Sequence, residues 1–341
     1  MKMVRAQEAL GAILCHDLTE IVPGGFKGPA FRKGHILREE DIPRLLDMGK
    51  EHIFVWEAAA GLLHENEATL RLGRAAAGPG IELTEPGEGR IHLKAAADGL
   101  LEIDLEGLQA LNADEQVSFA TLHTNQRVVK GKIVAGAHII PLAIEEARIG
   151  KIEEMRRNRP PVVQIKPLRS LRVGIVTTGS EVFSGRIKDR FGPVVVGKVE
   201  EAGCRVIGQT LVSDRVDLVS GAIEAFLNEG AELIAVTGGM SVDPDDVTPA
   251  GIRAAGGRIV TYGAPMLPGA MFMLAYIGSV PVLGLPGCVM YHKASIFDVV
   301  LPRILAGKEM TRQDFVKLAH GGLCAHCEPC GYPNCGFGKG A

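Results

Sequence analysis

Apolar residues form unbroken runs in the second half of the sequence, and each run ends at a turn that contains glycine. The runs 172–177, 233–237 and 280–285 have the length of single strands. Strands that are apolar on both faces are typical of parallel sheets, because helices cover such a sheet on both sides. The three runs therefore predict central strands of one parallel sheet.

Segments with helical spacing separate these runs. After Ser213 or Asp214, either of which can cap a helix, apolar residues share one helical face: Val216, Val219, Ile223, Phe226 and Leu227. A shorter helix is expected after Thr248 as its N-cap, with Pro249 at the first helical position. This alternation predicts that residues 171–308 form an α/β domain, with an open, mostly parallel sheet covered by helices on both faces.

The first 150 residues have a different pattern: helical segments and a Gly/Pro-rich loop over residues 1–60, and short extended segments separated by turns over residues 61–150. Residues 1–60 predict a mixed N-terminal region, and residues 61–150 predict a strand-rich domain. The elements expected in them are helices over 6–13 and 39–49 and strands over 52–56, 90–94, 100–105 and 126–134.

Residues 151–170 combine a basic run with prolines. Arg156 to Arg159 leads into Pro160 and Pro161, which predicts a solvated linker. A ligand-binding patch is the weaker interpretation of the same basic run.

Composition narrows the class of protein. The chain has 341 residues, of which 46% are hydrophobic and 23% charged, a balance that can bury a core and keep a solvated surface. Lys and Arg total 37 against 40 Asp and Glu, which gives a formal net charge of −3. A near-neutral chain with 5% aromatic residues lacks the basic and stacking surfaces that nucleic acids require, so nucleic acid is not expected as a partner.

The stretch 259–291 carries no charged side chain and is long enough to span a membrane. Prolines and glycines interrupt it, so short buried strands joined by turns explain it better than a transmembrane helix. Near the start of the chain, His16 and Asp17 follow a brief apolar run at once, which does not fit a secretory signal. A cytoplasmic protein without a membrane partner is therefore expected.

The glycine turns are the first candidate for chemistry. Open parallel sheets bind ligands beyond the carboxyl ends of their strands, where backbone N–H groups favour anions such as phosphates. The second turn, residues 238–246, also contains Asp243, Asp245 and Asp246. Three carboxylates in four residues suit Mg²⁺ held together with phosphate oxygens, although Asp245 or Asp246 could instead cap the next helix.

Four ordered motifs resemble the molybdopterin-binding domain family, and within it the molybdopterin molybdenumtransferases. They are Thr178-Gly179-Ser180-Glu181, the Gly-Gly-x-Ser-Val turn at 238–242 followed by Asp246, the pair Pro268-Gly269, and Leu285-Pro286-Gly287. The resemblance implies a role in molybdenum cofactor biosynthesis, in which molybdate is inserted into adenylylated molybdopterin and AMP is released. It also implies molybdopterin and molybdate as ligands and a homodimer as the assembly.

The resemblance further implies a role for each matching residue. Asp246, Asp243 and Glu181 are expected to be catalytic, with Asp246 binding Mg²⁺. The residues expected to bind the substrate are Thr178, Gly179, Ser180, Asp189, Gly238, Gly239, Ser241, Pro268, Gly269, Pro286 and Gly287.

Two of the turns depart from the family pattern. The family's Pro-Gly-Lys is Pro268-Gly269-Ala270 here, so a cation that could meet phosphate is missing, and Cys288 replaces the asparagine of the last turn. These differences favour a second interpretation, a non-catalytic molybdopterin-binding carrier or sensor. A generic nucleotide-binding α/β protein is the third.

Cysteines are concentrated in a tail, residues 309–341, that lies outside the resemblance. Cys324, Cys327, Cys330 and Cys335 have the spacing C-x2-C-x2-C-x4-C, which lets a short loop wrap one metal centre. Zn²⁺ and an iron–sulfur cluster both suit four thiolates, and a reduced tail without metal is the weaker alternative. The other cysteines are expected to be core residues: Cys15, Cys204 and Cys288.

Overall fold

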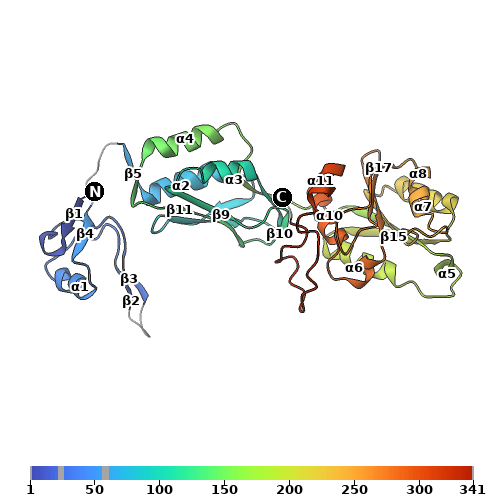
Figure 1. The fold of residues 1–341 in the computed structure, drawn as a ribbon, viewed down its shortest axis with the longest axis horizontal. Coiled ribbons are helices and arrows are strands. Elements are labelled where there is room, and N and C mark those ends of the chain that lie inside the picture. The colour runs from blue at the N-terminus through green and yellow to red at the C-terminus, as the bar shows by residue number, and fades with distance from the viewer. Residues whose placement is uncertain (1, 22–26, 56–60, 340–341) are drawn as a thin grey trace. The chain divides into compact units, whose positions relative to one another are not determined.

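The computed structural model describes residues 2–21, 27–55 and 61–339. The chain divides into two compact units (Figure 1). The first unit comprises residues 1–96, 103–122 and 131–164, and the second comprises residues 97–102, 123–130 and 165–341. Each unit contains its own hydrophobic core.

A six-stranded sheet forms the centre of the second unit, with the strand order β15-β14-β16-β19-β18-β17. The first four strands in this order are parallel, and β18 is antiparallel to both of its neighbours. The strands are β14 (Arg172–Thr178), β15 (Arg205–Val212), β16 (Leu233–Thr237), β17 (Arg258–Tyr262), β18 (Met273–Ile277) and β19 (Val280–Leu285). The predicted fold class and the three predicted central strands are confirmed.

Helices cover both faces of this sheet, as predicted. One face carries α6 (Phe191–Glu201), α9 (Cys288–Tyr291), α10 (Ile296–Leu305) and α11 (Arg312–Lys317). The other carries α7 (Val216–Asn228) and α8 (Thr248–Ala254). Residues of β14 are divided between the two cores, since Val173 and Ile175 face the first and Val176 the second. A one-turn helix, α5 (Ser180–Phe183), follows β14 directly.

The helix starts differ from those expected from the sequence. The N-cap of α7 is Arg215, and neither Ser213 nor Asp214 caps it. The N-cap of α8 is Val247, and Thr248 is already the first helical residue. Ser213 and Asp214 are hydrogen-bonded to Ser180 in the turn after β14. Thr248 donates to Gly238 at the start of its own loop and lies 3.3 Å from Thr178 Oγ1, so contacts outside the helix override the local capping preference.

The N-terminal part of the first unit packs two short strand pairs around one small core. These are β1 (Lys2–Arg5) with β4 (His52–Val55) and β2 (Leu18–Ile21) with β3 (Lys27–Phe31), next to α1 (Asp41–Asp47). The helix predicted over 6–13 is wrong. Only Ala6–Glu8 forms a 3₁₀ turn, η1, because Gly11 has φ +78° and Ile13 forms a bridge to Ile36.

The rest of the first unit is an antiparallel sheet with the order β6-β7-β11-β9, to which helices are added. Its strands are β6 (Ile81–Leu83), β7 (Arg90–Ala95), β11 (Ile133–Ile139) and β9 (Val117–Thr121). The helices are α2 (Glu65–Ala76), α3 (Leu105–Leu111) and α4 (Glu146–Arg156), and β5 (Leu62–His64) pairs with β12 (Ala143–Glu145). A separate three-stranded sheet has the order β10 (Gln126–Val128), β8 (Gly99–Ile103) and β13 (Val163–Lys166), and its β10 and most of its β8 are counted in the second unit.

Two sequence predictions in this part of the chain are wrong. The strand expected over 126–134 is split between β10 and β11, since Gly131 turns the chain with φ +81°. The linker expected over 151–170 contains the second half of α4 and all of β13. Arg156 from the basic run is buried and bonds Asp104 at 3.0 Å, so it is not part of a solvated face.

None of the helices within the described ranges is long and apolar enough to cross a bilayer. The uncharged stretch 259–291 forms β17, β18 and β19 with α9, which confirms the expectation of short buried strands.

Glu65 is a buried carboxyl group at the start of α2, with 8% of its surface exposed. Burial is the main cause that raises its pKa from 4.5 to about 7; Lys33 opposes the shift, and Glu88 and Asp17 add to it. Since the folded pKa lies above the unfolded value, ionisation of Glu65 opposes folding. The stability that the neutral form provides below pH 4.5 is therefore lost as the pH rises through about 7.

We expect Glu65→Gln to stabilise the protein at pH 8 and to have little effect at pH 5. The amide keeps the shape of the side chain without a buried charge. At pH 8 the thermal midpoint should rise by about 2–4 °C, the shift that 1 kcal/mol produces in a unit of this size. Glu67→Gln, on an exposed position of the same helix, is the matched control. If the difference in thermal midpoint between the Glu65 variant and wild type is the same at pH 5 and pH 8, the raised pKa of Glu65 is contradicted.

Candidate functional site

Parallel pairing brings the three glycine turns to one edge of the six-stranded sheet. Thr177 of β14 lies beside Thr237 of β16, which in turn lies beside Leu285 of β19. The antiparallel β18 begins at the same edge, since Met273 lies beside Gly284, so the loop before it returns there as well. The prediction that the turns share one edge is confirmed. The strand order reverses between β14 and β16, the position at which open α/β sheets bind ligands.

The first and second turns are in direct contact. Gly238 has φ +84°, and a Cβ atom there would overlap the carbonyl oxygen of Thr178 and lie 2.7 Å from its hydroxyl oxygen. A Cβ at Gly239 would lie 2.9 Å from the hydroxyl oxygen of Thr248. Only glycine allows this approach, because it combines a positive φ with the absence of a side chain.

Buried threonine hydroxyls hold this contact together, and the sequence reasoning missed their role. Thr248 Oγ1 donates to the Gly238 carbonyl oxygen at 2.9 Å and lies 3.3 Å from Thr178 Oγ1. Thr237 Oγ1 donates to Thr177 Oγ1 at 3.2 Å. All four threonines are at most 4% exposed. Threonine at the last positions of two strands that are otherwise apolar was the signal that could have identified them.

In the first turn, Ser180 is tied to the turn that follows β15. The Ser180 N–H donates to Asp214 Oδ2 at 2.7 Å, and the hydroxyls of Ser180 and Ser213 lie 2.9 Å apart. Gly179 is buried with φ +145°, and Glu181 extends its exposed carboxylate beside it. The structure therefore places Thr178, Gly179, Ser180 and Glu181 at the edge, with Ser180 already hydrogen-bonded.

Both carboxylate oxygens of Asp189 accept hydrogen bonds from neighbouring residues. Its Oδ1 accepts the backbone N–H groups of Phe191 and Gly192 at 2.8 and 3.0 Å, at the start of α6. Its Oδ2 accepts a hydrogen bond from Gln209 Nε2 at 2.6 Å, and the same nitrogen donates to Thr177 Oγ1 at 2.9 Å. Asp189 thus links α6 to the threonine network.

The aspartates of the second turn form a closed loop at the surface. The Asp243 N–H donates to Asp246 Oδ2 at 3.2 Å, and the Asp246 N–H donates to the Asp243 carbonyl oxygen at 3.0 Å. Asp243 and Asp245 are exposed and Asp246 is half-buried, and none of them caps α8. Clustered carboxylates repel one another, so a cation or a donor-rich ligand at this loop would lower its energy.

Tyr262 anchors the same loop from the end of β17. Its hydroxyl donates to the carbonyl oxygens of Met240 and Ser241, each at 3.2 Å. Burial, and then the Asp246 carboxylate, raise the pKa of Tyr262, which keeps the phenol neutral as a donor. Its position in an uncharged stretch gave no sign of this contact in the sequence.

The remaining two turns pack against helices. Pro268 and Gly269 are buried, and a Cβ at Gly269, which has φ +134°, would lie 3.2 Å from the backbone nitrogen of Ile296 in α10. The Ile296 N–H donates to the Pro268 carbonyl oxygen at 3.3 Å. Pro286 is buried and Gly287 is exposed at the start of α9.

The four cysteines of the tail line one cavity of about 250 Å³. Within the described ranges, no three His, Cys, Asp or Glu side chains are close enough to hold a metal ion as they stand. This applies equally to the thiols of the tail and to the aspartates of the second turn. Cys15 and Cys204 are buried, as expected for core residues, and Cys288 is half-buried.

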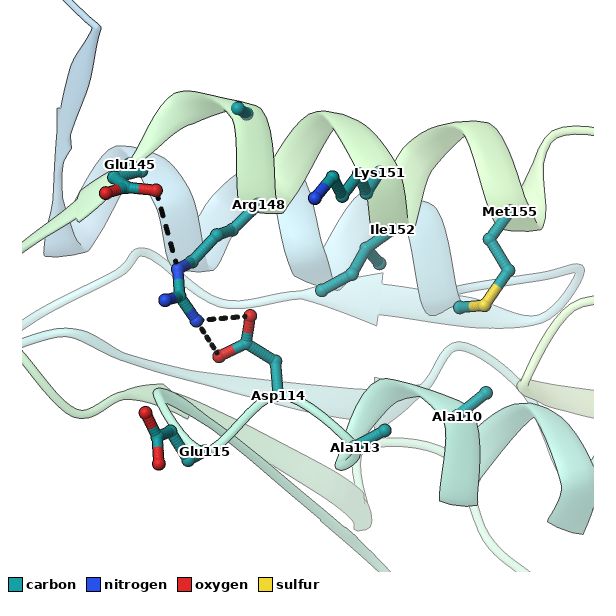
Figure 2. A pocket seen from close by; sticks show the side chains of 10 residues that line it. Ala110, Ala113, Asp114, Glu115, Glu145, Arg148, Lys151, Ile152 and Met155 are labelled. Atoms are coloured by element: carbon teal, nitrogen blue, oxygen red, sulfur yellow. Dashed lines mark hydrogen bonds and ion pairs between the residues drawn. The ribbon is translucent and has the colours of Figure 1, made fainter.

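A cavity of about 610 Å³ in the first unit lies outside all of these motifs. Figure 2 shows that it is lined by Glu145 and side chains of α4 on one side, and by Ala110 of α3 and the residues that follow this helix on the other. Arg148 bonds both carboxylate oxygens of Asp114 at 3.1 Å and also lies near Glu145. Since Arg148, Asp114 and Glu145 are paired with one another, they are less available to a ligand than the polar groups at the edge of the sheet.

Two families match parts of the chain. Residues 174–306 match the family described as "Probable molybdopterin binding domain", and residues 3–57 match one described as a domain of unknown function. A CinA-like protein of Mycobacterium sp. (strain MCS) is 36% identical over 89 residues, 26% of this chain and 21% of that protein. A CinA-like protein of Mycobacterium tuberculosis (strain H37Rv) is 35% identical over 79 residues, 23% and 18% of the two chains. The chain thus spans about a fifth of the length of these curated relatives.

Two solved structures from molybdopterin biosynthesis align with part of this chain. The enzyme MoaB of Thermus thermophilus is 21% identical, with 40% of this chain and 98% of that chain covered and a TM-score of 0.33. The MoeA protein of Pyrococcus horikosii is 17% identical, with 72% and 79% covered and a TM-score of 0.35.

We expect Gly238→Ala to destabilise the second unit more than Gly256→Ala does. Both glycines have φ above +80°, and a Cβ at Gly256 meets no atom within 4 Å. Gly256→Ala should cost about 1–2 kcal/mol for the left-handed backbone alone. Gly238→Ala adds the overlap with Thr178, which should cost a further 1–3 kcal/mol or so. Free energies of unfolding from urea titrations check this; equal costs would show that the two turns are not in contact.

Proposed function

Since residues 174–306 belong to the probable molybdopterin binding domain family, we propose that this chain binds adenylylated molybdopterin at the described edge of its sheet. We propose further that it inserts molybdate into this ligand and releases AMP. The observation that carries the proposal is that all four matching motifs lie at one edge of the domain, although more than a hundred residues separate the first from the last.

The ligand's phosphate groups suit the turns at this edge. The glycine turns present backbone amides, and helices α5, α8 and α9 begin beside them with their positive ends toward the edge. Gly287 and Ser241 are exposed there, so they are accessible to a ligand. We assign the pterin and phosphate portions of the ligand to these turns, with Ser180 and Ser241 as hydroxyl partners.

The second turn supplies the carboxylates. Mg²⁺ is commonly bound by one or two carboxylates together with substrate phosphates and water, rather than by a complete protein cage. Asp243 and Asp246 fit that mode, since they lie together at the surface and no third ligand is needed from the chain. Mg²⁺ bound there would neutralise phosphate charge.

The roles of the chain's own residues follow from this placement. Asp246 and Asp243 orient the phosphate end of the substrate, and Tyr262 holds the loop that carries them. We assign the exposed carboxylate of Glu181, which lies beside Gly179, to orient water or molybdate oxygens. The dithiolene sulfurs of molybdopterin bind molybdenum as AMP leaves.

A carrier or sensor of molybdopterin is the second candidate, and one observation favours it. Ala270 occupies the exposed position after Pro268-Gly269 where the resembling enzymes have lysine. A chain without that cation has lost one charge that could meet phosphate or molybdate. Such a protein would bind the ligand without turning it over.

One experiment separates the two candidates. The full chain is incubated with adenylylated molybdopterin, Mg²⁺ and molybdate, and AMP release and protein-bound molybdenum are followed together. If the protein is the enzyme, the amount of AMP released equals the amount of molybdenum bound in the pterin. Tight binding without AMP release selects the carrier, and no binding at all rejects both.

We expect Asp246→Ala to lose insertion activity while it largely keeps ligand binding. Removal of a carboxylate that orients Mg²⁺ should lower the rate of AMP release at least about tenfold, whereas the glycine turns that contact the ligand are unchanged. Asp217→Ala, at an exposed aspartate of α7, is the matched control. Wild-type turnover in the Asp246 variant would remove this residue from the proposed role.

A further inference from the structure

We propose that Cys324, Cys327, Cys330 and Cys335 bind a metal centre through four thiolates, and that this centre holds the Pro268–Gly269 turn in place. The ligand class is a thiophilic metal, either a zinc ion or an iron–sulfur cluster. The site lies outside the residues matched by the molybdopterin-binding family, and it does not depend on the proposed function.

The four thiols share one enclosure. All of them line the 250 Å³ cavity, whose other walls include Leu323, Tyr332 and Phe337. Each cysteine is a free thiol. The thiols line a hollow and do not yet meet at one point, since no three ligands within the described ranges are in metal-binding position.

Both metal centres are compatible with such a hollow. A zinc ion requires four sulfurs at about 2.3 Å from the metal, so the loop would tighten around it. An iron–sulfur cluster takes its four cysteines around a larger core and needs less movement. Metal binding commonly completes a site in this way, because the binding free energy also orders the loop.

The chain turns sharply between Cys324 and Cys327, as two cysteines that bind the same metal require. His326 lies in the left-handed region with φ +50°, a conformation that a residue with a side chain rarely adopts. Its backbone N–H is directed at Cys324 Sγ, 3.4 Å away. Hydrogen bonds from backbone N–H groups to cysteine sulfur stabilise thiolates and tune metal centres.

The loop that carries the cysteines is folded onto the core of the second unit. The Tyr332 hydroxyl donates to the carbonyl oxygen of Asp298 in α10 at 2.7 Å. Arg303 of the same helix is buried and donates to the Gly338 carbonyl oxygen at 2.8 Å, and burial lowers its pKa to about 10. Phe337 is 5% exposed. These anchors hold the second half of the loop, so a metal would find its ligands partly arranged.

The same loop is hydrogen-bonded to the candidate site. The Cys324 N–H donates to the Leu267 carbonyl oxygen at 2.8 Å, and the Leu267 N–H donates to the Gly322 carbonyl oxygen at 2.8 Å. Leu267 directly precedes the Pro268–Gly269 turn. On the other side, the ring of His326 lies 5.6 Å from that of His292, which ends α9. A metal that fixes Cys324 therefore also fixes the backbone that enters the turn.

Metal content tests the site itself. The full chain is purified without oxygen from cells supplied with zinc and iron, and both metals are measured together with the visible absorbance of an iron–sulfur cluster. About one zinc, or one cluster, per chain is expected, and Cys324→Ser and Cys335→Ser should each fall below about a tenth of that content. Cys288→Ser, a cysteine outside the tail, should keep it.

Three results would overturn the metal site. They are less than about a tenth of an equivalent of both metals in the wild type, metal content that the tail variants leave unchanged, and thiols paired as two disulfides without metal. If a serine variant does not fold, titration of the wild-type thiols before and after addition of a chelator shows instead whether the tail cysteines bind a metal. In that titration the chelator should expose four additional reactive thiols.

Hydrogen exchange tests the link to the turn. Removal of the metal from the wild type should speed exchange of the Leu267 and Cys324 amides at least about tenfold, because both lie in the bridge between loop and turn. Amides of β16 serve as the internal control and should not change. An unchanged exchange rate at Leu267 would overturn the proposal that the metal holds the Pro268–Gly269 turn. The metal site itself is decided by the metal content. Neither measurement uses a pterin, so their failure is distinct from failure of the proposed function.

Discussion

The shared register of β14, β16 and β19 is the constraint on which the candidate site depends. Thr177, Thr237 and Leu285 lie side by side, so three strands that are far apart in the sequence end at one level. The chain then leaves β14 toward the face covered by α6 and leaves β16 toward the face covered by α8. Because neighbouring strands are only about 4.8 Å apart, the turns after them must pack closely, and glycine is needed where they touch.

Polar side chains from other elements hold these glycine turns in position. Glycine has no side chain that could hydrogen-bond the backbone of its turn. The backbone N–H and C=O groups of these turns therefore need hydrogen-bond partners from other residues. Thr248 supplies a hydroxyl to Gly238, Tyr262 supplies one to Met240 and Ser241, and Asp214 accepts the Ser180 N–H. The residues that hold the site are thus mostly different from those expected to bind the substrate.

Side chains of the tail belong to the core of the α/β unit. Tyr332, Cys330 and Cys335 pack against the same hydrophobic cluster as α10, and the backbone around Leu323 forms a bridge to Leu267. The cysteine loop is therefore hydrogen-bonded to Leu267, the residue that directly precedes the Pro268–Gly269 turn. The proposed metal centre would lie one peptide unit from the edge of the sheet by this connection.

The sequence by itself determined the central strands, the long helix α7 and the positions of the glycine turns. A strand whose side chains are apolar on both faces is buried on both faces, and a glycine after such a run marks its turn. The φ angle is positive at Gly179 and Gly238 but −53° at Gly287, so local composition gives the turn and not its backbone conformation. The same reasoning failed over 6–13, over 126–134 and in the linker, where Gly11, Gly131 and a buried Arg156 decide the structure.

Only the tertiary structure decided which polar groups meet. Ser213, Asp214 and Thr248 are residue types that cap helices. Ser213 and Asp214 instead bond Ser180 in a turn remote in the sequence, and Thr248 meets Thr178 as well as Gly238 of its own loop. The partners of Asp189 and Tyr262, and the shared cavity of the four cysteines, likewise follow from the way the chain folds back on itself. The physical reason is that a hydrogen bond depends on where two groups lie in space, whereas spacing along the chain specifies only what each group could do.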